Sequence, residues 1–351
     1  MIKDYFKKYK FIKPIYYKLK TAMYWLVNFF PLLIKKIRLF YFVIVHADQQ
    51  TWLEFKILMT GISEYKKRVK NKNNIYYLKR QLHRLEKGLI QSEQKGEFAL
   101  GYILPTVETI SKIVFKKGKI DDLSKYGLEV LSKYFSSTVS EDKKYKKAKQ
   151  IFHRLNYSAT EKFIPFEYNL KEIHYTHFHE LVVGRKSIRN FSQNNVSRKT
   201  LNSAVNTANY APSGCNRKPY RFIIIDRKKY LEKFSSMPIG GGGNSFNAPV
   251  LVFVIGDQSV ASGLDSSHLS YIDASLATMT FVYALTEKGV GSCFLNWAHV
   301  YGNNIEAMKK LRLKPYELII TCIAVGYPDD KAKCAFSAPK DIRELIEYYE
   351  E

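Results

Sequence analysis

The sequence predicts an α+β protein, with a mostly helical first half followed by a region that mixes helices and strands. Between residues 54 and 154, apolar residues recur at spacings of three and four, which is typical of helices with one buried face. After residue 180, short apolar runs that favour strands are interspersed with helical patterns, without the regular alternation of a parallel sheet. We therefore expect three parts: a basic and aromatic segment (1–50), a helical region (51–169) and a mixed domain (170–351).

Positive charge is concentrated in the first half of the chain. The formal net charge is +24, and residues 1–180 contain 35 Lys and Arg against 17 Asp and Glu, whereas residues 181–351 contain 21 against 15. This excess favours an anionic partner. We expect no nucleic-acid partner, because the lysines alternate with apolar residues and no nucleic-acid-binding motif is present. A hydrophobic fraction of 46% is too high for a disordered chain.

The first 50 residues contain two apolar runs, 21–34 and 39–45, separated by Lys35, Lys36 and Arg38. Neither run reaches the roughly 20 residues that a transmembrane helix needs, and joining them would place three cations inside the bilayer. Two interpretations stay open. The segment lies on an anionic membrane surface, at the inner face of the cell membrane, or it forms amphipathic helices that pack on the rest of the protein.

The helical region is expected to contain four or more helices. The pattern predicts helix over most of 54–91, and then over 106–115, 123–135 and 143–154. The segment His83–Leu89 (HRLEKGL) carries adjacent charges and then Gly88, so we interpret it as a helix end with a solvated charged face.

Neither the histidines nor the cysteines predict a metal site. His174, His177 and His179 are spaced so that they do not share one face of a helix or strand. We instead expect a helix here that leads into Arg185. The four cysteines include no close pair, which favours a reducing, cytoplasmic setting over a disulfide framework.

The mixed domain has recognisable boundaries for several elements. Ser197 is a suitable N-cap for a helix that ends before Pro212. The sequence predicts a long helix over 270–288, with an apolar stripe and Gly289 as its C′ residue, buried on most sides in a core or a dimer interface. Strands are expected at 221–226, 249–255 and 318–325, and a last helix is expected after Lys340.

Two small, polar and basic segments bracket the helix after Ser197. The first is Arg185–Arg189 (RKSIR) and the second is Pro212–Pro219 (PSGCNRKP). Guanidinium groups, hydroxyls and free backbone N–H groups bind phosphate well, so these segments predict a site for a phosphorylated ligand. The glycines at 240–243 are not followed by the Lys-Ser/Thr of a P-loop, and we expect a mobile loop near the site there.

Residues 170–345 resemble the FMN-dependent nitroreductase family. The likeness covers six segments in the family's order, and HRLEKGL also resembles an extension found in nitroreductase-like proteins of surface-polysaccharide gene clusters. The six segments are RKSIRNF (185–191), APSGCNRKPYRF (211–222), NAPVLVFV (247–254), DASLA (273–277), GVGSC (289–293) and AVGYP (324–328).

The resemblance implies a nitroreductase-like sheet flanked by helices, and a homodimer with two FMN sites at its interface. Each site would take one segment from each subunit. Lys218 stands where the family usually has glutamine, which bears on contacts to the flavin or the substrate. The implied FMN-binding residues are Arg185, Lys186, Ser187, Arg189, Pro212, Ser213, Gly214, Asn216, Lys218, Gly291, Leu295, Asn296 and Lys340, with Lys333 as a second choice for the phosphate.

The expected function is that of an oxidoreductase. It would pass hydride from NADH or NADPH through FMN to a small organic acceptor such as a nitro compound, a quinone or an enone. The likeness of HRLEKGL suggests surface-polysaccharide metabolism as the setting. No catalytic side chain is predicted, because the cofactor carries the chemistry. The alternative is a membrane-associated flavin-binding or scaffold protein with weak or lost turnover.

Overall fold

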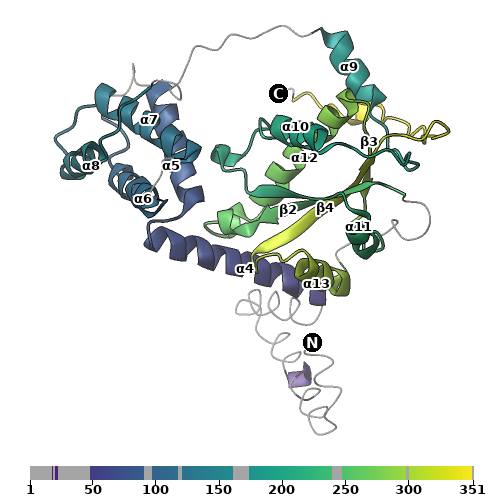
Figure 1. Ribbon diagram of the computed structural model, residues 1–351. Coiled ribbons are helices and arrows are strands. Elements are labelled where there is room, and N and C mark those ends of the chain that lie inside the picture. Colours follow the sequence, from purple (N-terminus) through teal and green to yellow (C-terminus); the bar gives the residue numbers. More distant parts are fainter. Residues whose placement is uncertain are drawn as a thin grey trace.

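The computed structural model describes residues 18, 20–22, 48–90, 97–117, 121–160, 174–238, 247–297 and 300–349. Figure 1 shows a group of helices beside a twisted sheet that is covered by further helices, which confirms the α+β prediction. The long helix α4 (Gln49–Lys70) runs along one side of the molecule, from the helical group to α13 beside the sheet. The predicted segment 1–50 lies almost wholly outside the described residues.

The helical group consists of α5 (Ile75–Ile90), α6 (Ile103–Lys117), α7 (Asp122–Ser137) and α8 (Lys143–His153). The apolar residues of α5 recur every three or four positions, so they lie on one face and reach the core that the four helices share. Asp121 and Asp142 begin α7 and α8 by accepting backbone N–H bonds with their side chains. The predicted helix over 54–91 is broken at residues 71–74, between α4 and α5.

Helix α4 packs closely against the mixed domain. A Cβ atom at Gly61 would lie 2.4 Å from the carbonyl oxygen of Gln258, so only glycine permits this approach. Near the C-terminal end of α4, Arg68 donates from Nη2 to the hydroxyl of Tyr316 at 2.5 Å. At the start of α5, the hydroxyl of Tyr76 donates to Asp257 Oδ2 at 2.9 Å. The helical group and α4 are therefore attached to the mixed domain by non-covalent contacts as well as by the backbone.

The sheet has four antiparallel strands in the order β1-β2-β4-β3. One face is covered by α10 (Arg198–Ala208) and α12 (Leu269–Glu287), which share a core with Val252, Val254 and Ile323. The other face packs with α11 (Lys228–Phe234) and α13 (Tyr301–Lys310), as seen in Figure 1. The strands are β1 (Tyr220–Ile225), β2 (Val250–Asp257), β3 (Gly291–Leu295) and β4 (Glu317–Gly326), and α9 (Tyr175–Gly184) precedes α10.

Most of the predicted elements are present within one to three residues of their expected bounds. Ser197 caps α10 by accepting from Thr200 N, and Gly289 follows α12 with a φ of 68°. The helix predicted after Lys340 is wrong, because the described chain has only a short 3-10 turn there (Ile342–Glu344). Strand β3 and the helices α11 and α13 were not predicted.

The loop predicted at the glycines 240–243 lies outside the described residues. Among the helices that are described, none combines the length and apolarity needed to cross a bilayer.

Candidate functional site

The segment Arg185–Arg189 lies along the edge of the sheet that β3 forms. Arg185 ends α9 as its C-cap, and the chain then turns extended. Ser187 forms a parallel bridge with Ser292, and Ile188 N donates to Ser292 O at 2.9 Å. A Cβ at Gly291 would lie 2.7 Å from Ile188 Cγ1, so the glycine lets the segment sit directly against β3. The structure thus brings together the predicted residues 185–189 and 291.

The positive charges of this edge have no carboxylate to neutralise them within the described chain. Arg189 Nη1 reaches only Ser187 O, at 3.5 Å, and Arg185 has no ion pair there. Burial raises the pKa of the Cys293 thiol, while the charges of Arg189 and Arg185 act in the opposite direction. The charges of Arg185 and Arg189 and the Ser187 hydroxyl therefore lie near Cys293 of β3, and Lys186 is exposed in the same segment. This donor set suits a phosphate or another anion.

The second segment, 213–218, forms a tight loop before β1. Cys215, Asn216 and Lys218 all have φ angles between 50° and 55°, in the left-handed region that non-glycine residues rarely adopt. Strained backbone of this kind persists only where surrounding contacts hold it, and it is common at ligand sites. Pro212 is exposed at the entrance to the loop, and Ser213 Oγ accepts from Lys218 N at 3.3 Å.

Buried charges hold this loop from inside. Gly214 N donates to both carboxylate oxygens of Asp273 in α12, at 3.0 and 3.2 Å. Arg217 is 6% exposed, and its Nε donates to Gly214 O at 2.7 Å. Burial raises the pKa of Asp273, whereas the Gly214 N–H and Arg217 lower it. The loop is therefore fixed by side chains of the domain itself, before any ligand binds.

A lysine of the helical group also reaches the loop. Lys79 of α5 donates from Nζ to the carbonyl oxygen of Arg217 at 3.3 Å. Next to it, Lys218 Nζ donates to Asn209 O at 2.5 Å and to Asn209 Oδ1 at 3.2 Å. Lys79 is not among the residues that the sequence predicts for the site. Its only signal was a position on α5 between buried Leu78 and half-buried Arg80, which does not reveal a contact 138 residues away.

The two segments lie at opposite edges of the sheet. Residues 185–189 adjoin β3, whereas the loop 213–218 leads into β1, and the strand order places β1 and β3 at the two ends. Within one chain they do not form a single pocket.

Three other residues predicted to bind FMN lie outside the two segments. Leu295 is buried at the end of β3, and Asn296 is exposed directly after it. Lys340 is exposed and forms an ion pair with Glu344 at 3.2 Å, and no described contact joins it to Arg185 or Arg189. The structure therefore does not bring Lys340 to either segment.

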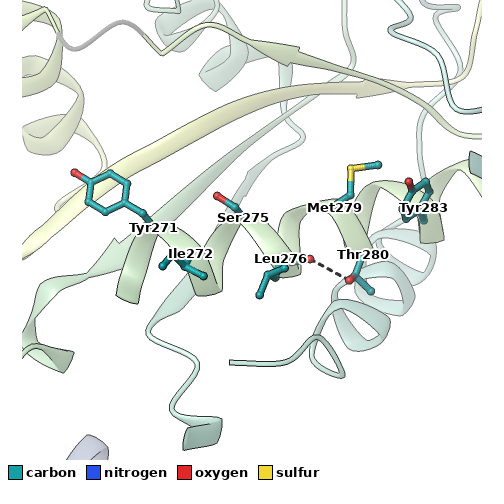
Figure 2. Close-up of a pocket in the computed structure, with 7 residues that line it drawn as sticks. All are labelled: Tyr271, Ile272, Ser275, Leu276, Met279, Thr280 and Tyr283. Atoms are coloured by element: carbon teal, nitrogen blue, oxygen red, sulfur yellow. Dashed lines mark hydrogen bonds between the residues drawn. The ribbon is translucent and has the colours of Figure 1, made fainter. Parts of the chain in front are cut away.

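Helix α12 carries an apolar face that the described chain leaves open. The predicted stripe is only partly covered, because Ile272 is 55% exposed and Leu276 is 43% exposed, whereas Met279 and Ala284 pack against the core. Ala274, Phe281 and Val282 fill the core from the opposite side of the helix. Figure 2 shows side chains on the outer side, which line a shallow groove: Tyr271, Ile272, Ser275, Leu276, Met279, Thr280 and Tyr283.

Comparison with known proteins identifies the domain that holds both segments. Residues 182–327 match the model of the Nitroreductase family. This part of the chain belongs to the nitroreductase family. A "Putative NADH dehydrogenase/NAD(P)H nitroreductase" of Archaeoglobus fulgidus is 26% identical over 155 residues, which are 43% of this chain and 86% of the relative. An "FMN reductase [NAD(P)H]" of Bacillus subtilis is 24% identical over 162 residues, which are 42% and 64% of the two chains.

Solved structures align with the same nitroreductase domain. An FMN-dependent nitroreductase from Clostridium difficile matches with a TM-score of 0.42 and 23% identity, over 49% of this chain and 99% of that one. A nitroreductase with bound FMN from Bacteroides fragilis matches with a TM-score of 0.41 and 20% identity, over 49% and 98%. The helical group that precedes the nitroreductase domain lies outside the family match.

Proposed function

We propose that the chain is an NAD(P)H-dependent oxidoreductase of the nitroreductase type, with FMN as its cofactor. The observation that carries the proposal is the pair of guanidinium groups at the β3 edge, which lie in a nitroreductase-family domain and have no carboxylate partner among the described residues. The names of the relatives, an NAD(P)H nitroreductase and an FMN reductase, support the same activity.

The β3 edge suits the anionic and polar parts of FMN. Arg185 and Arg189 would hold the phosphate and the polar edge of the ring, and Ser187 would donate from its hydroxyl. Backbone N–H groups near Gly291 and Asn296 would position the ring against the strand. Bound FMN supplies hydride and electron transfer between the nicotinamide and the acceptor. The work of the chain is to bind, orient and shield, which agrees with the absence of a predicted catalytic side chain.

We further propose a homodimer in which each site takes residues from both chains. The support is geometric: the two segments lie at opposite edges of one sheet, and α12 presents an exposed apolar face. Burying that face against a second copy removes Ile272 and Leu276 from water. The loop 213–218 of one subunit would then complete the site at the β3 edge of the other.

The acceptor is proposed to be a small nitro compound, quinone or enone. A role in surface-polysaccharide metabolism rests on the likeness of HRLEKGL alone. Four free cysteines support a reducing, cytoplasmic compartment. The competing proposal is a flavin-binding scaffold without turnover, located at a membrane surface through residues 1–50. The departure at Lys218, where the family usually has glutamine, motivates this alternative.

FMN binding is tested with purified protein. We expect flavin absorbance on purification or after incubation with FMN, and bleaching on anaerobic addition of NADH or NADPH. Arg185→Met should weaken FMN binding about tenfold or more, because a charge-assisted hydrogen bond to phosphate is lost. Arg227→Met, at an exposed position of the same domain, is the matched control. A protein that binds no flavin contradicts the proposal, and flavin without NAD(P)H oxidation favours the scaffold.

The dimer is tested by placing a charge on α12. We expect Leu276→Asp to give a monomer in sedimentation velocity and to weaken FMN binding, because a carboxylate would be buried without a partner. Val139→Asp is the control, since Val139 is 78% exposed in the helical group. A wild-type protein that sediments as a monomer with full FMN affinity would exclude the shared site.

A further inference from the structure

Lys79 and Lys218 come from different parts of the chain to the same loop, 213–218, and the charge of one acts on the other. Lys79 comes from α5 of the helical group, and its Nζ bonds the carbonyl oxygen of Arg217, which is in the peptide group that leads into Lys218. Lys218 extends from the strained loop of the nitroreductase domain, where Asn209 holds its Nζ. Neither lysine is fully exposed.

The described residues provide no carboxylate for this pair. No ion pair joins Lys79 or Lys218 to Asp or Glu in the described parts of the chain, and their recorded hydrogen bonds go to Arg217 and Asn209. Burial lowers the pKa of Lys79, and the charge of Lys218 lowers it further. Burial also lowers the pKa of Lys218. Two partly desolvated like charges are unfavourable together unless an anion compensates for them.

We propose that Lys79 and Lys218 form an anion-binding pair that selects acceptors with a negatively charged substituent. This inference rests on the proposed function, because the loop 213–218 is the segment that would lie along the flavin. An acceptor seated there would place its carboxylate, sulfonate or phosphate between the two ammonium groups. The nitroreductase domain alone supplies only half of this pair, so the helical group becomes part of the substrate site.

The fixed geometry of the pair favours selectivity. Asp273 and Arg217 hold the loop, and α4 and α5 are attached to the domain through Gly61 and Tyr76, so neither lysine has to be ordered when the acceptor binds. Preorganised charges lose less entropy on binding and exclude neutral or cationic analogues more strongly. Lys79 is thus expected to determine which acceptor is used rather than whether hydride is transferred.

The test compares two acceptors of nearly the same shape, 4-nitrobenzoate and 4-nitrobenzamide, on the full-length FMN-loaded protein. We expect the wild type to have the higher kcat/KM with the benzoate, and this preference to fall as salt is added. In Lys79→Met the ratio of the two kcat/KM values should fall about tenfold, as expected for a lost charge-assisted hydrogen bond. Lys79→Arg keeps the charge and should keep most of the preference. Lys87→Met, at an exposed lysine of the same helix, should leave the ratio unchanged.

A binding measurement separates this inference from the proposed function. Calorimetric titration of 4-nitrobenzoate into wild-type and Lys79→Met protein requires no turnover, and we expect the variant to bind about tenfold more weakly. If NAD(P)H is oxidised with neither acceptor, the proposed function fails, while weaker benzoate binding by the variant still supports the lysine pair. Equal benzoate binding by the two proteins, or an unchanged kcat/KM ratio in Lys79→Met, overturns the inference.

Discussion

The helical group and the nitroreductase domain bury their apolar residues in different ways. In the helical group, α5 has one apolar face, and Leu78, Leu82 and Leu85 on that face are fully buried. In the nitroreductase domain, α12 is apolar on both sides, and only the side with Ala274 and Phe281 reaches the core. One region thus completes its core within itself, while the other leaves an apolar surface for a further contact.

The buried carboxylate of the helical group and the cations at the proposed ligand sites also differ, in whether they have partners. Buried Glu129 of α7 accepts from Tyr157 and Thr160 within the helical group. The cations at the β3 edge and the Lys79–Lys218 pair have no such partner among the described residues. The buried carboxylate of the helical group is thus matched, whereas the cations at the β3 edge and the two lysines are not, and an anionic ligand is expected where those cations lie.

The largest predicted effect compares the two apolar surfaces directly. Leu82→Ala should lower the free energy of unfolding by about 3 kcal/mol, because it leaves a cavity in a closed core. Leu276→Ala should cost less than about 1 kcal/mol in dilute protein and more at high protein concentration, as expected for a contact between copies. Chemical denaturation at several protein concentrations measures both. A concentration-independent loss of equal size at Leu276 would remove the distinction between the surfaces.

The next prediction concerns the attachment of α4. Gly61→Ala should lower stability by about 2 kcal/mol, because its Cβ would meet the backbone of Gln258, which cannot easily move. Gly101→Ala is the control, since nothing lies within 4 Å of a Cβ there. Hydrogen exchange should show faster exchange in α4 and at residues 258–260, with little change in α7. Faster exchange confined to the helical group would mean that α4 belongs to that region rather than to the domain.

A third prediction uses two tyrosines of similar chemistry. Tyr76 donates to Asp257 across the two regions, whereas Tyr126 donates to Glu86 within the helical group, at 2.5 Å. Replacing either with phenylalanine should cost about 1 kcal/mol. Tyr76→Phe should in addition weaken the effect of Lys79 on acceptor choice, because α5 is then held less firmly against the domain. Tyr126→Phe should leave acceptor choice as in the wild type, and an equal change in both variants would contradict the role of this contact.

The sequence predicted local features well because their causes are local. The caps at Ser197 and Gly289, the strands rich in Ile and Val, and the RKSIR segment all depend on a few neighbouring residues. What it missed depends on long-range packing. The sequence predicts that α12 is buried in a core or a dimer interface, but it does not tell which side meets the core of its own chain: Ala274 and Phe281 do, and the larger Ile272 and Leu276 lie outside.

The candidate site shows the same limit. The segments 185–189 and 213–218 were found from their composition and from the family likeness, but periodicity could not reveal that they lie at opposite edges of the sheet. Lys79 could not be found at all, since its partner is 138 residues away and one lysine among many carries no signal. Lys340 was chosen by its approximate place in the chain, and the structure pairs it with Glu344 instead.

The smallest predicted effect is a pH-dependent ion pair at the β1 end of the domain. Arg198, in the first turn of α10, bonds Asp226 through Nε and Nη2, and this hydrogen bonding lowers the pKa of Asp226 below its usual value. A lowered carboxyl pKa stabilises the fold above the unfolded-state value and loses that contribution as the pH falls through the folded-state pKa.

Because Arg198 is 66% exposed, water and salt screen the pair, and Arg198→Ala should lower the free energy of unfolding only slightly at neutral pH. The difference between wild type and variant should shrink as the pH is lowered through the folded-state pKa of Asp226, because the protonated carboxyl no longer carries the charge that Arg198 pairs with. Urea unfolding over this pH range measures it, with Lys199→Ala as the control on the same helix. A difference that persists at low pH would mean that Arg198 stabilises α10 by packing rather than by its charge.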